Sequence, residues 1–319
     1  MKVIIQIPAY NEEKTLGITL KALPRHIPGV DKVEWLVISD GSKDNTIETA
    51  IAHGVDHIVD LAHNRGLARA FMVGIEKCLT EGADIIVNTD ADNQYNAEDI
   101  PKLITPILRK EADIVVGERP IFATQHFSLS KKLLQKLGSF ITRIVSKTRI
   151  PDAPSGFRAI NRHAAMRLNV FNDYTYTIET IIQAGWQGIK ITSVPIRTNE
   201  DLRPSRLVKS ISKYTRQTAF TMIRSLNTYR PLGFFLGAGA IPLFAGMLLC
   251  IRWVVFFMGD KPGSHLPSLI AAAILILLGI QMFIFGFIAD LISVNRKLLE
   301  DIQLSNRQQK FDHFTSKEY

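Results

Sequence analysis

The sequence has little cysteine. Its two cysteines, Cys78 and Cys250, fall in segments of different character, an expected soluble helix and a long apolar run. They do not form a useful pair, so we exclude a disulfide-stapled fold and expect both to be packing residues. The first residues also lack a signal-peptide pattern, because the apolar stretch Val3–Ile7 is short and stops at Pro8. We therefore expect the soluble part to stay in the compartment where it is made.

Several common catalytic signatures are absent as well. The sequence contains no G-x-G-x-x-G fingerprint, no P-loop, and no arrangement of Ser, His and Asp typical of a hydrolase. The eight histidines show no metal-ligand spacing, and we expect those near residues 53–63 at the surface or in loops. A metal site in this chain must therefore use other ligands.

Two long apolar runs lie in the C-terminal third. They are Leu232–Phe257, interrupted by Arg252, and Leu266–Ala289, which carries no charge. Each exceeds the roughly 20 residues that cross a bilayer core. A soluble helix rarely stays apolar on every side for that length. The sequence therefore predicts an integral membrane protein with a hairpin of two transmembrane helices at residues 231–295.

Basic residues flank this hairpin on one side. Arg224 and Arg230 precede the first run, and Arg296 and Lys297 follow the second. The positive-inside rule then predicts that both termini and the soluble part are cytoplasmic, with residues 296–319 as a tail. Membrane hairpins often associate, so a homo-oligomer remains open.

Charge is distributed unevenly along the chain. Residues 1–118 hold 12 Lys and Arg against 19 Asp and Glu, whereas residues 119–230 hold 19 against 5. An acidic first part is consistent with a metal site. A basic stretch that leads into a membrane suits anionic headgroups or a phosphorylated lipid. Nucleic acid is the usual rival partner, but the membrane hairpin argues against it.

The first 118 residues alternate between short β-branched runs and helical stretches. This pattern predicts an α/β domain at residues 1–204 with a mostly parallel sheet covered on both faces. The expected strands are Val3–Ile7, Trp35–Ser39, His57–Leu61, Asp84–Asn88 and Asp113–Val116, and the expected helices are Glu13–Leu23, Thr46–His53, Gly66–Glu81 and Ala97–Lys110.

Polar clusters follow three of these strands. They are Pro8–Glu13, Asp40–Asp44 and Asp90–Gln94. Ligands of such sheets bind outside the carboxyl ends of the strands, so the three clusters predict one shared site.

Two basic segments have helical spacing. Leu129–Lys147 places its apolar residues on one face and its lysines elsewhere, and a second basic helix is expected at residues 205–230, next to the first span. Such helices suit the membrane interface. Packing of their apolar faces on the domain is the alternative.

The sharpest chemical signal is Asp90-Ala-Asp92-Asn-Gln94. Two carboxylates just past a buried strand can approach one hard cation and the oxygens of a diphosphate. Mg²⁺ and Mn²⁺ favour such ligands and usually share them with substrate phosphates.

An ordered set of motifs gives these clusters a family resemblance. The motifs are Pro8-Ala-Tyr10-Asn-Glu12-Glu13, Ser39-Asp40-Gly-Ser-Lys-Asp44-Asn-Thr46, Asn64-Arg-Gly66, Asp90-Ala-Asp92-Asn-Gln94 and Ser155-Gly-Phe-Arg158. With these motifs in this order, the chain resembles family 2 glycosyltransferases of the GT-A fold over roughly residues 1–230, and within them the polyprenyl-phosphate glycosyltransferases.

The resemblance implies a site for a nucleotide-sugar donor, linked to UDP or GDP. One departure is Ser39, where the family usually has an Asp, but the carboxylate expected to meet the base is kept at Asp40. The implied metal is Mg²⁺ or Mn²⁺, held by Asp90, Asp92 and Gln94. The implied nucleotide-binding residues are Pro8, Ala9, Tyr10, Glu12, Asp40, Asp90, Ala91 and Asp92.

The resemblance also implies a polyprenyl-phosphate acceptor, undecaprenyl or dolichyl, and an inverting transfer that serves cell-envelope glycans or protein glycosylation. Asp152 matches a site residue near the acceptor phosphate, where it orients rather than deprotonates. Glu179 matches an acidic position. The implied catalytic residues are Asp152, Arg119 and Arg158, and the implied acceptor-phosphate residues are Arg119, Lys131, Arg203 and Arg206.

Three alternatives stay open. One is a glycosyltransferase that acts on another lipid, such as diacylglycerol or ceramide, with Asp152 as the base. Another is a processive polysaccharide synthase, although the sequence lacks its Q-x-x-R-W motif and further spans. The last is a non-catalytic membrane scaffold, against which the complete Asp90, Asp92 and Gln94 set argues.

Overall fold

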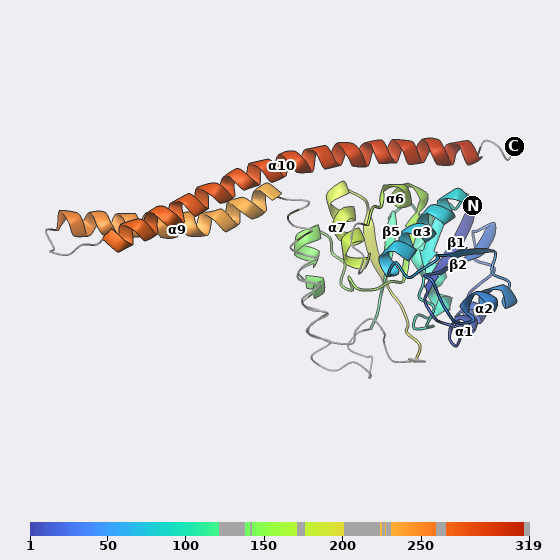
Figure 1. The fold of residues 1–319 in the computed structure, drawn as a ribbon. Helices are drawn as coiled ribbons and strands as arrows, with labels where there is room; N and C mark the ends of the chain where they lie inside the picture. The colour runs from blue at the N-terminus through green and yellow to red at the C-terminus, as the bar shows by residue number, and fades with distance from the viewer. Residues whose placement is uncertain are drawn as a thin grey trace. The chain divides into compact units, whose positions relative to one another are not determined.

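A computed structural model describes residues 1–120, 138–140, 142–170, 176–200, 224, 227, 231–259 and 266–315. The chain forms two compact units (Figure 1). The first comprises Met1–Thr221 together with Gln303–Tyr319, and the second comprises Met222–Ile302.

A seven-stranded sheet forms the centre of the first unit, with the strand order β3-β2-β1-β4-β6-β5-β7. Every pairing in it is parallel except those of β6, which runs antiparallel to β4 and β5. The strands are β1 (Lys2–Ala9), β2 (Lys32–Ser39), β3 (His57–Asp60), β4 (Ile85–Asn88), β5 (Ile114–Glu118), β6 (Arg158–Asn161) and β7 (Ile191–Pro195).

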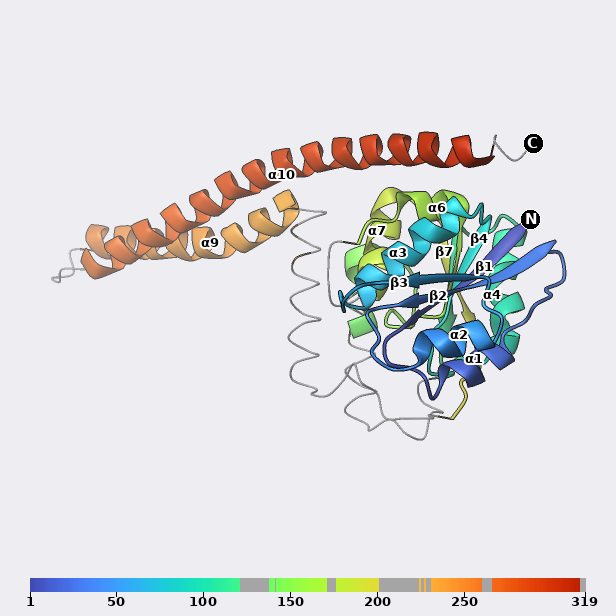
Figure 2. The ribbon, with the colours of Figure 1, turned by 45° about the vertical axis from the view of Figure 1, so that its right-hand side comes forward.

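The central strands are apolar on both faces because helices cover the sheet from both sides. Figure 2 shows α1 and α2 on one side of the sheet and α3 on the other. One face is covered by α1 (Leu16–Ala22), α2 (Thr46–Ala52), the 3-10 turn η1 (Ala97–Asp99) and α4 (Ile100–Leu108), and the other by α3 (Leu67–Thr80), α6 (Arg162–Arg167) and α7 (Thr177–Gln187).

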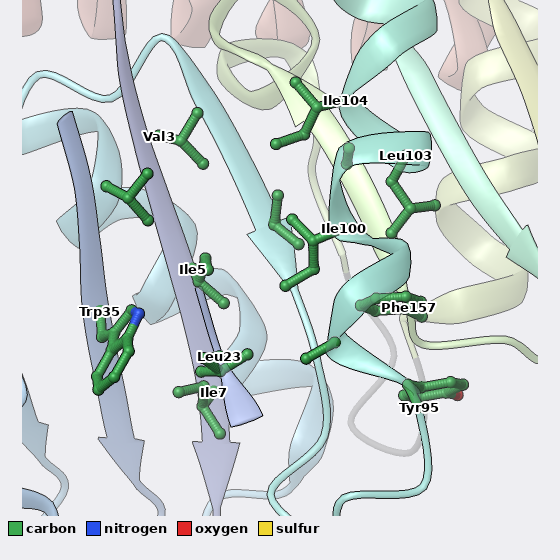
Figure 3. Close-up of a cluster of buried hydrophobic side chains, with 14 of the residues drawn as sticks. Val3, Ile5, Ile7, Leu23, Trp35, Tyr95, Ile100, Leu103, Ile104 and Phe157 are labelled. Atoms are coloured by element: carbon green, nitrogen blue, oxygen red, sulfur yellow. The ribbon is translucent and has the colours of Figure 1, made fainter. Parts of the chain in front are cut away.

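Alternate residues of β1 enter the two cores. Val3, Ile5 and Ile7 belong to the same buried cluster as Ile100 and Leu103 of α4 (Figure 3). Ile4 points the other way and joins the cluster under α3 and α6. Complete burial of these side chains is the main stabilisation of the unit, at roughly 1.5–3 kcal/mol each.

The predicted α/β class with a mostly parallel sheet is confirmed, and the five strands and four helices expected in the first 118 residues are all present. The sequence analysis did not identify β6 or β7. The antiparallel β6 matters for function because Arg158, its first residue, pairs with Asn88, the last residue of β4. The loop that precedes β6 therefore lies at the carboxyl ends of the parallel strands.

The second unit contains α9 (Pro231–Met258) and the first part of α10 (Leu266–Thr315). Both helices are long and apolar enough to cross a membrane, by length and composition. They approach closely at glycines: a Cβ at Gly239 would lie 2.9 Å from the carbonyl oxygen of Gly279. Small residues of this kind let backbones meet in a lipid environment.

Helix α10 continues well past the apolar run, through most of the predicted tail. Its last turns belong to the first unit. Phe311 is buried in the core cluster beside α3 and α6, and Arg307 is 8% exposed. The Arg307 guanidinium donates to the carbonyl oxygens of Met166 and Leu168, at 2.9 Å each. The end of the chain is thus a structural part of the first unit.

Candidate active site

The candidate site lies where the parallel strands end. Ala9 at the end of β1 pairs in register with Ser39 at the end of β2, and β4 ends next to them at Asn88. The loop before β6 and the residue after β5 reach the same edge. The chain thereby brings the three predicted polar clusters to one edge of the sheet, together with Arg119 and Asp152.

The loops after β1 and β2 are tied together by hydrogen bonds. The backbone N–H of Asn11 donates to Ser42 Oγ at 3.1 Å, and that of Glu12 donates to Thr46 Oγ1 at 2.9 Å. Glu12 is buried and accepts from Thr15 Oγ1 at 2.8 Å. The Tyr10 side chain is 40% exposed, which leaves an aromatic ring at the surface of this edge.

Asp40 organises the neighbouring loop. Its two carboxylate oxygens accept from the backbone N–H groups of Arg65, at 2.8 Å, and Gly66, at 2.9 Å. The backbone around His63 packs so closely on Gly41 that a Cβ there would lie 2.5 Å from the His63 carbonyl carbon, and Gly41 has a φ of 68°. Glycine is required at such a position. The contact of Asp40 with a nucleobase remains a prediction.

The loop after β4, which we call the metal loop (residues 90–96), has two buried residues, and its other residues are half-buried. Asp90, Asp92 and Gln94 are half-buried, whereas Ala91 and Tyr95 are buried. The three oxygen-bearing side chains are therefore accessible where the strands end. The loop is preshaped by a left-handed residue at Asn93, with a φ of 58°, and by a hydrogen bond from the Gln94 N–H to Asp92 Oδ1 at 3.2 Å.

The donor set of this loop fits a hard divalent cation. Among the described residues no group of three or more His, Cys, Asp and Glu side chains is arranged to hold a metal. Two carboxylates and an amide oxygen are fewer ligands than a complete protein cage. Mg²⁺ and Mn²⁺ are commonly held by one or two carboxylates together with substrate phosphates, so the set fits a shared site.

A buried, hydrogen-bonded cluster of polar groups lies next to Asp90. Asn88 Nδ2 donates to the Tyr176 hydroxyl at 2.8 Å and to the Gly156 carbonyl oxygen at 2.9 Å, and the Gly156 N–H donates to the Tyr95 hydroxyl at 3.0 Å. A Cβ at Gly156 would lie 3.2 Å from Asp90 Oδ1. Burial raises the pKa of Tyr95 and of Tyr176, and the nearby Asp90 carboxylate raises it further. Both phenols therefore stay protonated beside Asp90.

Arg119 and Asp152 form a buried, two-point ion pair. Arg119 Nε lies 2.7 Å from Asp152 Oδ2, and a terminal nitrogen lies 3.0 Å from Oδ1. The Asp152 side chain is fully buried, and that of Arg119 is 10% exposed. Burial alone lowers the pKa of a guanidinium, but the adjacent carboxylate more than offsets this and raises the pKa of Arg119. The pair holds a cation in a fixed position at the strand ends.

Arg158 is also buried, at 1% exposure. Its guanidinium donates to the carbonyl oxygens of Ser155 and Ala153, at 2.9 Å each, and to Thr180 Oγ1. Burial lowers its pKa to about 10. Through these contacts Arg158 stabilises the loop between Asp152 and β6. A direct contact with a substrate phosphate remains a prediction, and this geometry does not favour it.

Of the remaining predicted site residues, the structure describes Glu179 and does not describe the basic ones. Glu179 is buried in the first turn of α7. Lys131, Arg203 and Arg206 lie outside the described residues, as does part of the predicted helix at residues 129–147. The described end of that helix buries Ser139 and Val145 and exposes other side chains, namely Phe140, Arg143, Ile144 and Lys147.

Sequence reasoning missed the residues that support the metal loop. Asn88 and Tyr95 stand beside the acidic motif, and a polar residue at the buried end of a strand is the signal that could have identified Asn88. Asn199 also contacts the loop, with its N–H 2.9 Å from the Gln94 carbonyl oxygen. No local pattern marks Asn199, because the partners are about a hundred positions apart in sequence.

The sequence profile of glycosyl transferase family 2 matches residues 4–168, which is more than half of the chain. The chain belongs to glycosyl transferase family 2. The matched region contains the metal loop, Arg119, Asp152 and Arg158, so the family assignment rests on the same segments that converge at the strand ends.

Two characterised relatives resemble this family 2 glycosyltransferase. A UDP-N-acetylglucosamine–dolichyl-phosphate N-acetylglucosaminyltransferase of Methanococcus voltae is 32% identical over 60% of this chain and 83% of its own. An undecaprenyl-phosphate mannosyltransferase of Micrococcus luteus is 27% identical over 61% of this chain and 83% of its own.

A solved structure resembles the glycosyltransferase in fold. Glucosyl-3-phosphoglycerate synthase of Mycobacterium tuberculosis, with Mn²⁺, UDP and its product bound, has a TM-score of 0.55 at 20% identity and covers 69% of this chain and 79% of its own. This likeness shows the GT-A-like fold.

Proposed function

We propose that this glycosyltransferase moves a hexosyl group from a UDP- or GDP-linked donor to a polyprenyl phosphate at the cytoplasmic face of a membrane. The observation that carries the proposal is the convergence of the metal loop and the Arg119–Asp152 pair at one edge of the sheet, in a chain with two potential membrane helices. The named activities of the Methanococcus and Micrococcus relatives, both transfers to lipid-linked phosphates, support it.

On the donor side, Asp90, Asp92 and Gln94 would hold Mg²⁺ or Mn²⁺, and both ions are found with UDP in structures of the Mycobacterium synthase. When bound, the metal neutralises charge on the departing nucleoside diphosphate. The exposed ring of Tyr10 suits stacking on a base, and the neighbouring Ala9 is buried. The proposed nucleotide-binding residues are Pro8, Ala9, Tyr10, Glu12, Asp40, Asp90, Ala91 and Asp92.

On the acceptor side, Arg119 would bind the lipid phosphate. A phosphate monoester is already ionised at neutral pH, so it needs no strong base. Asp152 therefore orients Arg119 and keeps it charged. An acceptor oxygen attacks the anomeric carbon as the bond to the nucleoside diphosphate breaks, with inversion. Fixed cations hold the two anionic reactants together. Lys131, Arg203 and Arg206 are proposed to share this task.

The membrane side of the proposal rests on exposed residues. Phe140 and Ile144 are 51% and 63% exposed, with the cationic Arg143 and Lys147 beside them. An apolar surface flanked by basic residues suits the headgroup region. We place the hairpin across the bilayer with both termini in the cytoplasm, on the positive-inside argument, and a homo-oligomer through the hairpin is part of the same proposal.

A transfer assay tests the proposal. Full-length protein in lipid bilayers would receive undecaprenyl or dolichyl phosphate, Mn²⁺ or Mg²⁺, and a panel of labelled UDP- and GDP-sugars. We expect label in an organic-extractable, mild-acid-labile lipid. We also expect transfer to stop with EDTA and with Asp92→Asn. Label in an acid-stable lipid or an insoluble polymer would redirect the assignment to another glycosyltransferase reaction, and transfer by Asp92→Asn would overturn the metal assignment.

A further inference from the structure

The metal loop is held by a strap (residues 196–199) that follows β7. The strap runs antiparallel beside the loop, where Thr198 forms a β-bridge with Tyr95. The Asn96 N–H donates to the Arg197 carbonyl oxygen at 3.2 Å, and the Asn199 N–H donates to the Gln94 carbonyl oxygen at 2.9 Å. The loop that carries the proposed metal ligands therefore has a short strand pairing of its own.

Asn199 adds two side-chain contacts. Its Nδ2 donates to the carbonyl oxygens of Asn93, at 2.9 Å, and Tyr95, at 3.3 Å. With its backbone, Asn199 thus binds three consecutive carbonyls of the metal loop. An amide nitrogen is required for these contacts, because an aspartate of the same size would place a carboxylate against two carbonyl oxygens.

Arg197 holds the 3-10 turn η1, which directly follows the metal loop. Its backbone N–H lies 2.6 Å from Asp99 Oδ2, and a terminal nitrogen lies 2.9 Å from Oδ1. Asp99 is fully buried. Burial alone raises the pKa of a carboxyl group, but the hydrogen bonds from Arg197 and Lys102 outweigh it and lower the pKa of Asp99 to about 2. The strap is therefore bonded to the chain at two places, at Gln94–Asn96 and again at Asp99.

We propose that Asn199 is a positioning residue that sets Asp92 and Gln94 for the divalent cation. The inference rests on the proposed function. Gln94 lies between the two carbonyls that the Asn199 side chain binds, and its own carbonyl accepts the Asn199 N–H. The orientation of Gln94 therefore depends on the strap.

The test compares two asparagine substitutions of the full-length protein. Asn199→Ala removes the two side-chain contacts and keeps the backbone bond. The matched control is Asn161→Ala, at the amino end of the β4 pairing, where Asn161 bonds Asp113 and caps α6. Free Mn²⁺ would be measured by electron paramagnetic resonance during titration with UDP and, separately, with GDP.

We expect Asn199→Ala to weaken Mn²⁺ binding in the presence of the nucleotide by about 10-fold, the size of effect seen when outer-shell partners of metal ligands are removed. Asn199→Asp should weaken it more. Asn161→Ala should lower the melting temperature and leave Mn²⁺ affinity unchanged. Equal Mn²⁺ affinity in Asn199→Ala and the wild type overturns the inference, as does an equal loss in both alanine variants.

A second measurement needs no variant. Hydrogen exchange of the wild-type protein should slow in residues 196–200 as well as in the metal loop when Mn²⁺ and UDP or GDP are added. Protection confined to the metal loop overturns the proposed link between the loop and the strap. A wild-type protein that binds no Mn²⁺ with either nucleotide instead refutes the metal site of the proposed function, so the two failures are distinguishable.

Discussion

Gly156 lies between the buried Tyr176 hydroxyl and the Asp90 carboxylate, and its replacement by alanine tests that packing. The new Cβ would lie 2.9 Å from the Tyr176 hydroxyl and 3.2 Å and 3.4 Å from the two Asp90 carboxylate oxygens. Contacts below 3.0 Å force a neighbour to move. Tyr176 is fully buried and stacked on Phe71 with a centroid distance of 3.8 Å, so it has little room to yield.

Overpacking of this kind costs about 1–3 kcal/mol. For a unit of this size that loss corresponds to a fall in melting temperature of roughly 2–12 °C. The easier movement is that of Asp90, which is only half-buried. A displacement near 1 Å at a reacting centre can reduce turnover by about 100-fold. We therefore expect Gly156→Ala to lose most of its transfer activity and to require more Mn²⁺ for half-maximal rate.

A double-mutant cycle with Tyr176→Phe decides whether the clash is the cause. Tyr176→Phe alone removes the hydroxyl that accepts from Asn88, which costs about 1 kcal/mol. In the double variant the Cβ no longer meets that oxygen, so the combined loss of stability should be smaller than the sum by about 1 kcal/mol. Additive losses would refute the steric argument. Gly237→Ala is the control, because a Cβ there meets no atom within 4 Å.

Three further outcomes are expected. Glu34 is buried, and the hydrogen bonds from Lys2, Lys32 and His57 outweigh the effect of burial and lower its pKa to about 2. It therefore stabilises the fold above pH 4.5, and this contribution, on the order of 2 kcal/mol, is lost as the pH falls toward 2; Glu34→Gln should flatten that part of a melting curve measured against pH. Asp152→Asn should lower stability by about 3–5 kcal/mol, because it leaves Arg119 buried without its counter-charge; transfer should fall at every pH between 6 and 8. Arg307→Ala leaves two backbone carbonyls without their donor, so thermal unfolding should show a loss of about 2–3 kcal/mol.

Exposed residues of the same types provide the controls for these variants. Glu111→Gln and Arg109→Ala change side chains on the surface of the first unit. Surface substitutions usually stay within about 0.5 kcal/mol. A melting temperature of Arg307→Ala equal to that of Arg109→Ala would contradict the role given to the end of α10. Normal transfer by Asp152→Asn would contradict the role given to the ion pair.

The parallel half of the fold was predictable because its signals are local. The β-branched runs of β1 and β2 alternate with helical stretches, and each run has the length and composition of a strand rather than of a helix. Strand β6 has only four residues, Arg158–Asn161, with polar residues at both ends. Its place in the sheet is fixed by pairing with β4 and β5, which no local pattern encodes.

The candidate site was likewise predictable only where its residues lie close together in the sequence. The metal loop was predictable because its residues follow one strand in sequence. The contact of Arg119 with Asp152 depends on β6, since the antiparallel strand brings a loop some thirty positions away to the end of β5. The burial of Arg158 was equally hidden, because a motif gives the residue type and not the carbonyl oxygens around it.

The core of the first unit is completed by Phe311, which lies near the end of α10 and follows both apolar runs in the sequence. During synthesis, everything up to β7 leaves the ribosome before α9 and α10 exist, yet the surface under α3 and α6 still lacks its last apolar side chain. That surface stays open to water, or to a chaperone, while the apolar helices are being made. Completion of the catalytic unit is thereby linked to the synthesis of the two long apolar helices, and a nascent chain stalled before α10 would hold an unfinished enzyme.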